Sequence, residues 1–202
     1  MSKHLFVDVE TLGTESNAVL LSLGMVYADF SEDFTYDQLI ATSFYVKFDA
    51  NEQKEMGRTM ERGTIEWWKK QDKEVFDSEV RVKPTDVKLL GGLNQAAEWI
   101  ASVPGYSRKT GTVWTRGSID DMVLGSVCKQ VGRAPLFPFY LVRDVRTAVD
   151  LLYESYNGYV DIDAPMPNVQ KHNPTADAAL DAMMLRYGSP VNPQGAKYYE
   201  DS

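Results

Sequence analysis

Two acidic residues, Asp8 and Glu10, interrupt an apolar segment near the start of the chain, Leu-Phe-Val-Asp-Val-Glu. Side chains two positions apart on a β-strand point to the same face of a sheet, so these carboxylates can share a target. The same spacing recurs at three places that we expect to be solvated surface: Asp72/Glu74, Asp77/Glu79 and Asp161/Asp163. Uncompensated carboxylates are costly to bury in an apolar strand. The first pair is therefore the candidate for binding a divalent cation, with acids at a sheet edge as the alternative.

His172 and Asp177 form a second candidate site, in the segment His-Asn-Pro-Thr-Ala-Asp. On one continuous helix, positions five apart would lie ~140° apart and could not share a target. Asn173 is a typical N-cap and Pro174 fits a first helical position, which places His172 before the helix and Asp177 in its first turn. An imidazole over a rigidly held carboxylate can accept a proton from water. The alternative is a surface histidine in front of an ordinary helix.

A third acidic position follows the segment Trp114-Thr-Arg-Gly-Ser, where Asp120 or Asp121 begins a helix. An acid at a helix N-terminus is usually only a cap. Here it accompanies acids on two distant segments and one histidine, the set that a two-metal phosphodiesterase requires. Several carboxylates can hold two Mg²⁺ or Mn²⁺ ions about 3.5–4 Å apart, which neutralise the attacking and leaving oxygens.

The elements that must position these residues follow from periodicity. The first half predicts strands over 5–10, 19–27 and 42–48, which short loops would join into an antiparallel meander, and a helix over 64–71 with Thr64 as its N-cap. The second half alternates helices over 89–100, 120–131 and 146–156 with strands over 113–115 and 140–145, which predicts parallel strands. A final helix runs from its Asn173 cap to Gly188.

Taken in chain order, these motifs resemble a known family. Phe-Val-Asp8-Val-Glu10-Thr11, Gly117-Ser-Ile-Asp120 and His172-x4-Asp177 are similar to the three exonuclease motifs of the DEDDh 3′–5′ exonucleases, which have a ribonuclease H-like fold. Neighbouring segments, such as Thr64-Ile-Glu-Trp-Trp-Lys-Lys-Gln71, resemble the phage exonuclease A group and the mycobacterial-type exoribonucleases. The similarity runs from Leu5 to Tyr187. The family's fold agrees with the element pattern, which predicts an α/β fold with a mixed sheet flanked by helices. Because no internal repeat or long linker is evident, we expect one domain over residues 1–188 with a tail over 189–202.

The resemblance also implies roles for single residues. The metal ligands fall on Asp8, Glu10, Asp120 and Asp177, and the general base falls on His172; Asp121, adjacent to Asp120, is the alternative at that position. Thr11 and Leu12 would cradle the terminal nucleotide. Trp67 or Trp68 could stack on a base, but neighbours on a helix point ~100° apart, so at most one faces the substrate.

The implied activity is a 3′–5′ exonuclease that uses two Mg²⁺ or Mn²⁺ ions and releases nucleoside monophosphates from single-stranded 3′ ends. DNA is favoured, with an exoribonuclease as one alternative and a catalytically idle nucleic-acid-binding module as another. The family also suggests a homodimer, for which Trp68 or Phe76 would be the exposed aromatic residues.

Charge and composition set further bounds. The chain has 202 residues, with 21 Lys and Arg against 29 Asp and Glu, and its net charge of −8 excludes a broad cationic nucleic-acid-binding surface. The single cysteine, Cys128, excludes an internal disulfide and a multi-thiolate zinc site, which favours a reducing compartment. The longest apolar run is too short to span a membrane, and no signal peptide is evident. These features predict a cytoplasmic protein, or one of the host cytoplasm if a phage encodes it.

Overall fold

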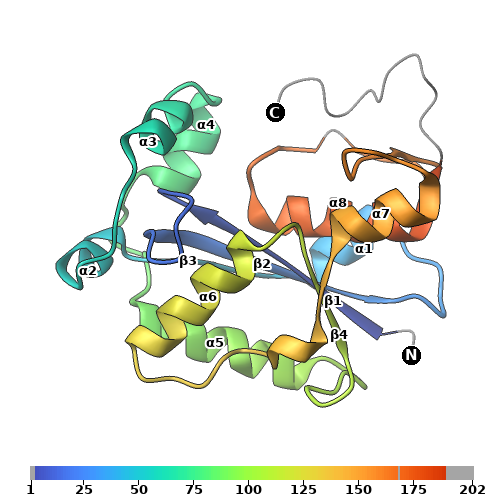
Figure 1. Ribbon diagram of the computed structural model, residues 1–202, viewed down its shortest axis with the longest axis horizontal. Coiled ribbons are helices and arrows are strands. Elements are labelled where there is room, and N and C mark those ends of the chain that lie inside the picture. The colour runs from blue at the N-terminus through green and yellow to red at the C-terminus, as the bar shows by residue number, and fades with distance from the viewer. Residues whose placement is uncertain (1–2, 168, 190–202) are drawn as a thin grey trace.

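The structure is a computed structural model that describes residues 3–167 and 169–189. Its centre is a five-stranded sheet in the order β3-β2-β1-β4-β5 (Figure 1). The strands are β1 (Lys3–Thr11), β2 (Leu20–Asp29), β3 (Phe44–Lys47), β4 (Thr112–Thr115) and β5 (Val142–Asp144). Strands β1, β2 and β3 pair antiparallel, whereas β4 and β5 run parallel to β1. The predicted mixed sheet, a meander followed by parallel strands, is confirmed.

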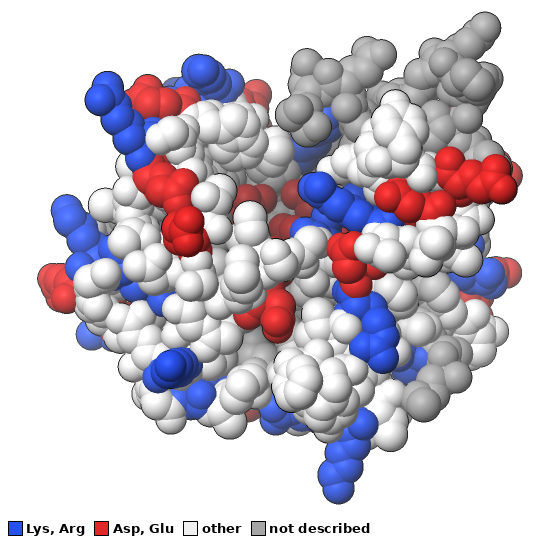
Figure 2. Space-filling view, in the orientation of Figure 1, with Lys and Arg blue, Asp and Glu red and all other residues white. Residues whose placement is uncertain are grey.

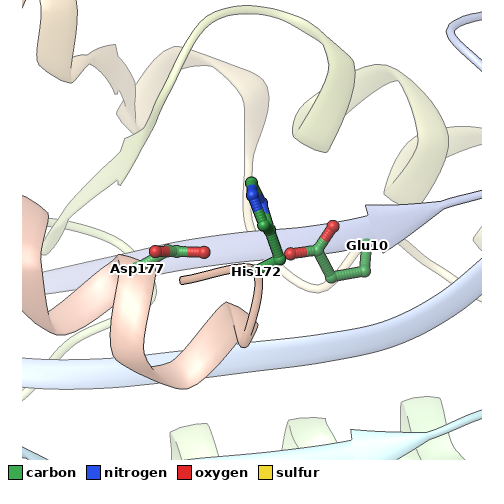
Figure 3. Close-up of side chains that lie close together, drawn as sticks. All are labelled: Glu10, His172 and Asp177. Carbon is green, nitrogen blue, oxygen red and sulfur yellow. The ribbon is translucent and has the colours of Figure 1, made fainter. Parts of the chain in front are cut away.

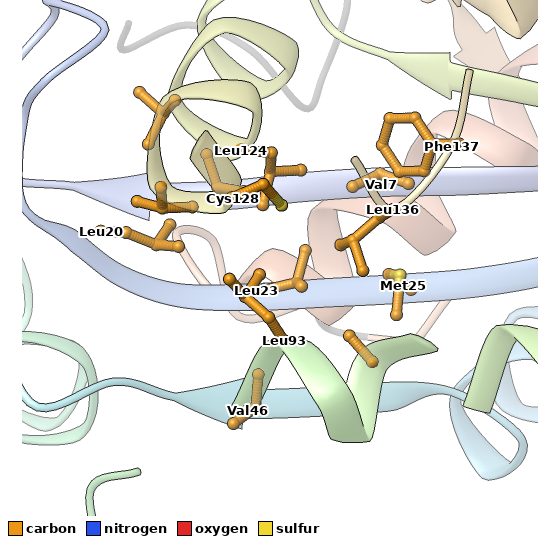
Figure 4. Close-up of a cluster of buried hydrophobic side chains, with 14 of the residues drawn as sticks. Val7, Leu20, Leu23, Met25, Val46, Leu93, Leu124, Cys128, Leu136 and Phe137 are labelled. Carbon is orange, nitrogen blue, oxygen red and sulfur yellow. The ribbon is translucent and has the colours of Figure 1, made fainter. Parts of the chain in front are cut away.

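Helices cover both faces of this sheet. One face packs against α5 (Leu89–Ser102) and α6 (Ile119–Gln130), and the other against α1 (Tyr36–Ala41), α7 (Val145–Tyr153) and α8 (Pro174–Tyr187). Alternate residues of β1 divide between the two cores, with Val7 on the α5–α6 side, shown in Figure 4, and Phe6 on the α8 side. The acids Asp8 and Glu10 continue the alternation on the same side as Phe6. Their side chains therefore face α8.

A smaller helical unit lies at one end of the sheet, at the upper left of Figure 1. It contains α2 (Ala50–Glu55), α3 (Arg62–Trp68), α4 (Lys73–Val75) and the π-helical turn η1 (Phe76–Val80). Its small core joins Trp68 and Val75 to Leu12, Val19 and Leu21 at the ends of β1 and β2. The sequence predicted one helix in this region.

The predicted N-cap of that helix, Thr64, is wrong. The cap position of helix α3 lies three residues earlier, at Glu61, whose side chain forms no cap bond. The carboxylate of Glu61 instead accepts a hydrogen bond from the Thr14 backbone N–H at 2.8 Å, and its own N–H donates to the Leu12 carbonyl at 2.7 Å. A contact with the loop after β1 thus sets the helix start, which local capping signals do not reveal.

The last helix begins as predicted. The Asn173 side chain accepts a hydrogen bond from the Ala176 N–H at 3.1 Å, Pro174 occupies the first turn, and Gly188 follows the last helical residue. Helix α8 is buried on almost all sides, between the sheet and its neighbours. Short elements complete the fold: the 3₁₀ turn η2 (Phe139–Leu141), which occupies the start of the predicted strand over 140–145, and the pair β6 (Asp161–Ile162) and β7 (Gly188–Ser189).

Beyond Ser189, the predicted tail lies outside the described residues. Within 3–167 and 169–189, none of the helices has both the length and the apolar character that a membrane crossing requires.

Gly24 fixes where α8 meets the sheet. It pairs with Asp8 across the β1–β2 ladder, and a Cβ atom at this position would overlap the backbone of Pro174 and Thr175. The absence of a side chain therefore lets the first turn of α8 rest directly on β2, next to Asp8.

Candidate active site

Strand β1 carries the first two acids of the site. Asp8 lies opposite Gly24, and Glu10 lies opposite Ser22, in the antiparallel ladder with β2. The register shifts between Glu10 and Thr11, immediately after the second acid. Such bulges bend a strand and change the direction of the side chains beside them. Both carboxylates lie on the face that receives the N-terminus of α8.

The turn before α8 carries the predicted base. His172 has a φ of 60°, in the left-handed region that non-glycine residues seldom adopt, and Asn173 then starts the helix. Donor atoms of Glu10, His172 and Asp177 all lie within 4.8 Å of one another. Figure 3 shows the three side chains together, with the imidazole between the two acids. The structure thus joins the first and last predicted motifs.

Asp120 enters the cluster from the first turn of α6. Its side chain is only 5% exposed and accepts hydrogen bonds from the Val9 N–H at 3.3 Å and the Arg116 N–H at 3.2 Å. Val9 lies between the two acids of β1, so this contact attaches Asp120 to that strand. Asp121 is less buried, and among the described residues it has no such contact. Of the two adjacent acids, Asp120 is the one placed at the site.

Burial raises the pKa values of all four acids, and repulsion by neighbouring carboxylates, Asp181 among them, adds to it. Burial, followed by the charge of Asp120, raises the pKa of Asp8 well above its usual range. The pKa of Glu10 is raised by burial and then by Asp177. Burial also raises the pKa of Asp120 to about 8 and that of Asp177 to about 7. The folded chain therefore holds these carboxylates in their charged form only at a cost.

This donor set fits a divalent metal. Carboxylate oxygens are the ligands that Mg²⁺ and Mn²⁺ prefer, and a bound cation would offset the repulsion that raises these pKa values. Arg116, whose charge acts on Asp120 and Asp177, is paired with a different carboxylate: its Nη2 lies 2.6 Å from Asp181 Oδ1. The site therefore has a negative charge that a bound divalent cation would offset, carried by the side chains of Asp8, Glu10, Asp120 and Asp177.

Sequence reasoning missed the pair formed by Arg116 and Asp181. Asp181 lies one turn after Asp177 on α8, is buried, and accepts from both Nε and Nη2 of Arg116 at 2.9 and 2.6 Å. The guanidinium also donates to the Gly158 carbonyl and lies 4.4 Å from the ring centre of Tyr159. The i, i+4 spacing of two acids on a helix otherwise rich in small and apolar residues was the available signal.

Glu79 was expected to be solvated, and that expectation is wrong. Its side chain is 1% exposed, because the π-helical turn η1 directs it inward against β2 and β3. Ser22 Oγ donates to it at 2.6 Å and the Tyr45 hydroxyl at 3.0 Å. π-Helical turns are rare and frequently occur near functional sites.

The two adjacent tryptophans point in different directions, as predicted. Trp68 is 1% exposed and its Nε1 donates to the Thr11 carbonyl at 2.9 Å, so it cannot be the exposed aromatic residue of a dimer interface. Phe76 is partly buried against the same small core. Trp67 is 41% exposed, and its ring centre lies 4.8 Å from that of His172.

The predicted nucleotide-binding residues after the first motif lie at the end of β1. Thr11 is half-buried and its hydroxyl donates to the Gly13 carbonyl at 2.7 Å, whereas Leu12 is buried in the small core beside Trp68.

The surface of the molecule has a hollow that contains acidic side chains. Figure 2 shows acidic side chains recessed between the unit that carries α3 and α4 and the side that carries α7 and α8, with basic side chains near the rim. A cavity of about 530 Å³ adjoins His172 and is lined by α4 and the segment before α8, with Gln71, Asp72, Glu74, Val75, Val169, Gln170 and Lys171. This cavity therefore opens beside the predicted base, His172, and none of the four acids of the cluster lines it.

A mixed five-stranded sheet with acids on its first strand, after its fourth strand and on the last helix, joined by one histidine, defines a DEDDh nuclease of the ribonuclease H-like fold. Comparison with known proteins agrees. The model of the Rv2179c-like 3′-5′ exoribonuclease domain matches residues 3–188, and the chain belongs to this family. It is a metal-dependent 3′–5′ exonuclease whose substrates are nucleic acids. The ribonuclease H-like fold and the 3′–5′ exonuclease activity that the motifs implied are confirmed.

Individual relatives are distant. The chain is 25% identical over 199 residues to an exodeoxyribonuclease of Enterobacteria phage T4, with 90% of this chain and 86% of that protein aligned. The nuclease domain of 3′hExo, a DEDDh family member solved with rAMP, has 14% identity and a TM-score of 0.56 over 92% of this chain and 90% of its own. Cell-death related nuclease 4 has 12% identity and a TM-score of 0.55; the chain covers 63% of that structure. These solved structures show the shared fold.

Proposed function

We propose that the chain removes nucleoside monophosphates from the 3′ ends of single-stranded nucleic acid, with Asp8, Glu10, Asp120 and Asp177 holding two Mg²⁺ or Mn²⁺ ions. The observation that supports this most directly is the meeting of Glu10, His172 and Asp177 within 4.8 Å. When bound, two such ions neutralise charge on the attacking and leaving oxygens of the phosphodiester. Asp8, Glu10 and Asp177 would hold one ion, and Asp8 and Asp120 the other.

His172 is the proposed general base. Burial lowers its pKa below the usual value, and the neighbouring Lys171 lowers it further, so the imidazole is neutral at pH 7 and able to accept a proton from the attacking water. The rings of Trp67 and Trp68 pack edge-on against it and limit its movement. Asn173, the next residue, caps α8 and fixes the backbone on its other side.

The terminal nucleotide would meet Thr11, Leu12 and Trp67. Trp67 offers an exposed ring beside His172, and base stacking on such a ring contributes about 1–3 kcal/mol. Thr11 offers its backbone at the end of β1, and Leu12 supports it from the small core. An idle binding module is disfavoured, because it would gain nothing from keeping four repelling carboxylates close together.

DNA is our favoured substrate, because the phage T4 relative, aligned over most of both chains, is an exodeoxyribonuclease. RNA is the second candidate, because the matching family is described as exoribonuclease. We also infer that residues 1–188 form a single domain. The protein would act in the cytoplasm, or in the cytoplasm of the host if a phage encodes it. We further infer that it forms a homodimer. Light scattering of the purified chain tests the dimer.

The test uses 5′-labelled single-stranded DNA and RNA of equal sequence, with Mg²⁺, Mn²⁺ or EDTA. We expect a ladder that shortens from the 3′ end, nucleoside monophosphates as products, and no cleavage in EDTA. Asp8→Asn should abolish turnover without lowering the melting temperature of the metal-free protein. A second pair of variants compares Asp120→Asn with Asp121→Asn. The latter is the matched control, because Asp121 is an adjacent acid outside the cluster. Full activity of Asp8→Asn would contradict the metal scheme, and the faster substrate identifies the sugar.

His172→Ala separates the base from the ligands. We expect kcat to fall by about 10²–10⁴-fold, the range for loss of a positioned general base. Mn²⁺ affinity measured by calorimetry should change little. A large loss of Mn²⁺ affinity instead would mean that His172 is itself a metal ligand.

A further inference from the structure

Glu79 is a buried acid outside the four proposed ligands. Its carboxylate accepts hydrogen bonds from four neutral side chains: Ser22 Oγ at 2.6 Å, the Tyr45 hydroxyl at 3.0 Å, Asn173 Nδ2 at 3.4 Å and, from the adjacent residue, Ser78 Oγ at 3.4 Å. Within the described part of the chain it forms no ion pair. Burying a carboxylate with only neutral partners is costly, because these bonds must replace its whole hydration.

The three partners outside η1, namely Ser22, Tyr45 and Asn173, each belong to a different element of the site. Ser22 lies opposite Glu10 in the β1–β2 ladder, so the contact places Glu79 beside the second acid of the first motif. Tyr45 belongs to β3, and Asn173 is the cap of α8. Glu79 itself comes from η1, in the helical unit at the end of the sheet. One carboxylate therefore joins four segments around the site.

Asn173 is the most informative partner, because both ends of its amide are used. Its Oδ1 accepts from the Ala176 N–H at 3.1 Å and caps α8, while its Nδ2 donates to Glu79. The cap fixes the orientation of the amide, which leaves the NH₂ group facing Glu79. His172, the residue before it, has the unfavourable φ of 60°. Such a conformation persists only where the surroundings hold it in place.

We propose that Glu79 is a positioning residue for the exonuclease: by holding the Asn173 amide, it keeps the His172 turn and the start of α8 at a fixed place relative to Glu10. Glu79 touches neither substrate nor the reacting atoms. The closeness to Glu10 is also electrostatic, since Glu79 contributes, after burial and Asp177, to the raised pKa of Glu10. This inference rests on the roles proposed above for His172 and Asp177.

An exchange of donor and acceptor provides the test. Asn173→Asp keeps a good N-cap but places a carboxylate opposite Glu79, and Glu79→Gln removes the charge that holds the amide. In the double variant Glu79→Gln with Asn173→Asp, the glutamine amide can donate to the aspartate, so the contact is restored with its direction reversed. We expect each single variant to lose about tenfold to hundredfold in kcat, because misplacement by ~1 Å is that costly, with little change in KM. The double variant should recover at least tenfold over Asn173→Asp.

A second readout does not depend on activity. The chain has two histidines, so in a His4→Gln background the imidazole NMR signals of the metal-free protein report on His172 alone. These signals should shift or broaden in both single variants and return in the double variant. Asn173→Ser, which keeps a cap and adds no charge, serves if Asn173→Asp does not fold. Glu98→Gln, on the exposed side of α5, is the matched control and should leave kcat within twofold of wild type.

The outcomes are distinct. Two results would overturn the role of Glu79, even if the wild type is an active exonuclease. In the first, the kcat losses of the two single variants multiply in the double variant. In the second, the imidazole signals stay unchanged in both single variants. A folded wild type without nuclease activity would overturn the proposed function, and the NMR comparison would still decide whether Glu79 positions the turn.

Discussion

Asp120 occupies a position where a charged carboxylate destabilises the folded chain. Its usual pKa of 3.8 applies in the unfolded chain, and burial raises its pKa to about 8 in the folded one. The folded state therefore binds a proton more tightly between these values. Stability is highest at pH values where Asp120 is protonated in both states and falls as pH rises from about 4 through 8.

The first prediction follows at the residue scale. In EDTA, the melting temperature of the wild type should fall as the pH is raised from 5.5 to 8.5. Asp120→Asn removes this titration, so its melting temperature should fall less and exceed that of the wild type by several degrees at pH 8.5. Asp121→Asn, the adjacent control, should behave more like the wild type, because the pKa of Asp121 is raised by weaker burial. Parallel melting curves for wild type and Asp120→Asn would contradict the burial of a charge there.

At the scale of elements, the Arg116–Asp181 pair joins the turn after β4 to the middle of α8. Both side chains are largely buried, and the pair lies between the segments that carry Asp120 and Asp177. Breaking a buried pair from one side leaves an uncompensated charge, which costs far more than the pair itself contributes.

Arg116→Ala should therefore lose about 3–5 kcal/mol of unfolding free energy at pH 8, measured by urea denaturation. The double variant Arg116→Ala with Asp181→Asn should recover part of this loss, because neither charge of the pair is then left unpaired. Arg116→Lys is the conservative comparison and should fall between, since an ammonium group cannot reproduce the two bonds to Asp181 or the stacking on Tyr159. A loss below about 1 kcal/mol for Arg116→Ala would show that water reaches Asp181.

Elements with a complete local signal were predictable from the sequence. The cap, proline and glycine of α8 and the apolar stripe of α5 are local patterns, and both helices occur where expected. Helices α1, α2 and α4 have at most six residues, too few for a periodic pattern to emerge. The start of α3 depends on a contact between Glu61 and Thr14, residues far apart in the sequence.

The same distinction applies to the site. The sequence alone suggested a candidate site of five residues, because they belong to short motifs in a fixed order: Asp8, Glu10, Asp120, His172 and Asp177. Glu79 was misjudged because its acid-x-acid spacing is the same as that of surface pairs, and only the π-helical turn makes it buried. Asp181 was missed because its significance comes from Arg116, 65 positions away.

At the scale of the whole molecule, the net charge of −8 opposes binding of a polyanion. Four of the acids meet where the substrate must arrive, so repulsion is strongest at the site itself. Two divalent cations would halve the net charge and place positive charge at the point of contact.

We therefore expect the metal-free chain to retain single-stranded DNA weakly. With Ca²⁺, tested as a replacement cation that slows turnover, binding should tighten and depend on salt. Fluorescence anisotropy with labelled DNA in EDTA and in Ca²⁺ measures both. Asp8→Asn with Asp177→Asn, which removes two charges, should bind DNA better than the wild type in EDTA and respond less to Ca²⁺. Tight, salt-insensitive binding by the wild type in EDTA would show that a surface elsewhere holds the strand.

The contact between α8 and Gly24 limits which substitutions the protein tolerates at position 24. The first turn of the helix lies directly on the backbone of β2 there, so even alanine would push Pro174 and Thr175 away from Asp8. In a saturation library selected for nuclease activity, we expect position 24 to accept glycine alone, while neighbouring core positions accept other apolar residues. Because the side chain of Gly24 is only a hydrogen atom, α8 can approach β2 closely enough to set the spacing between the first and last motifs.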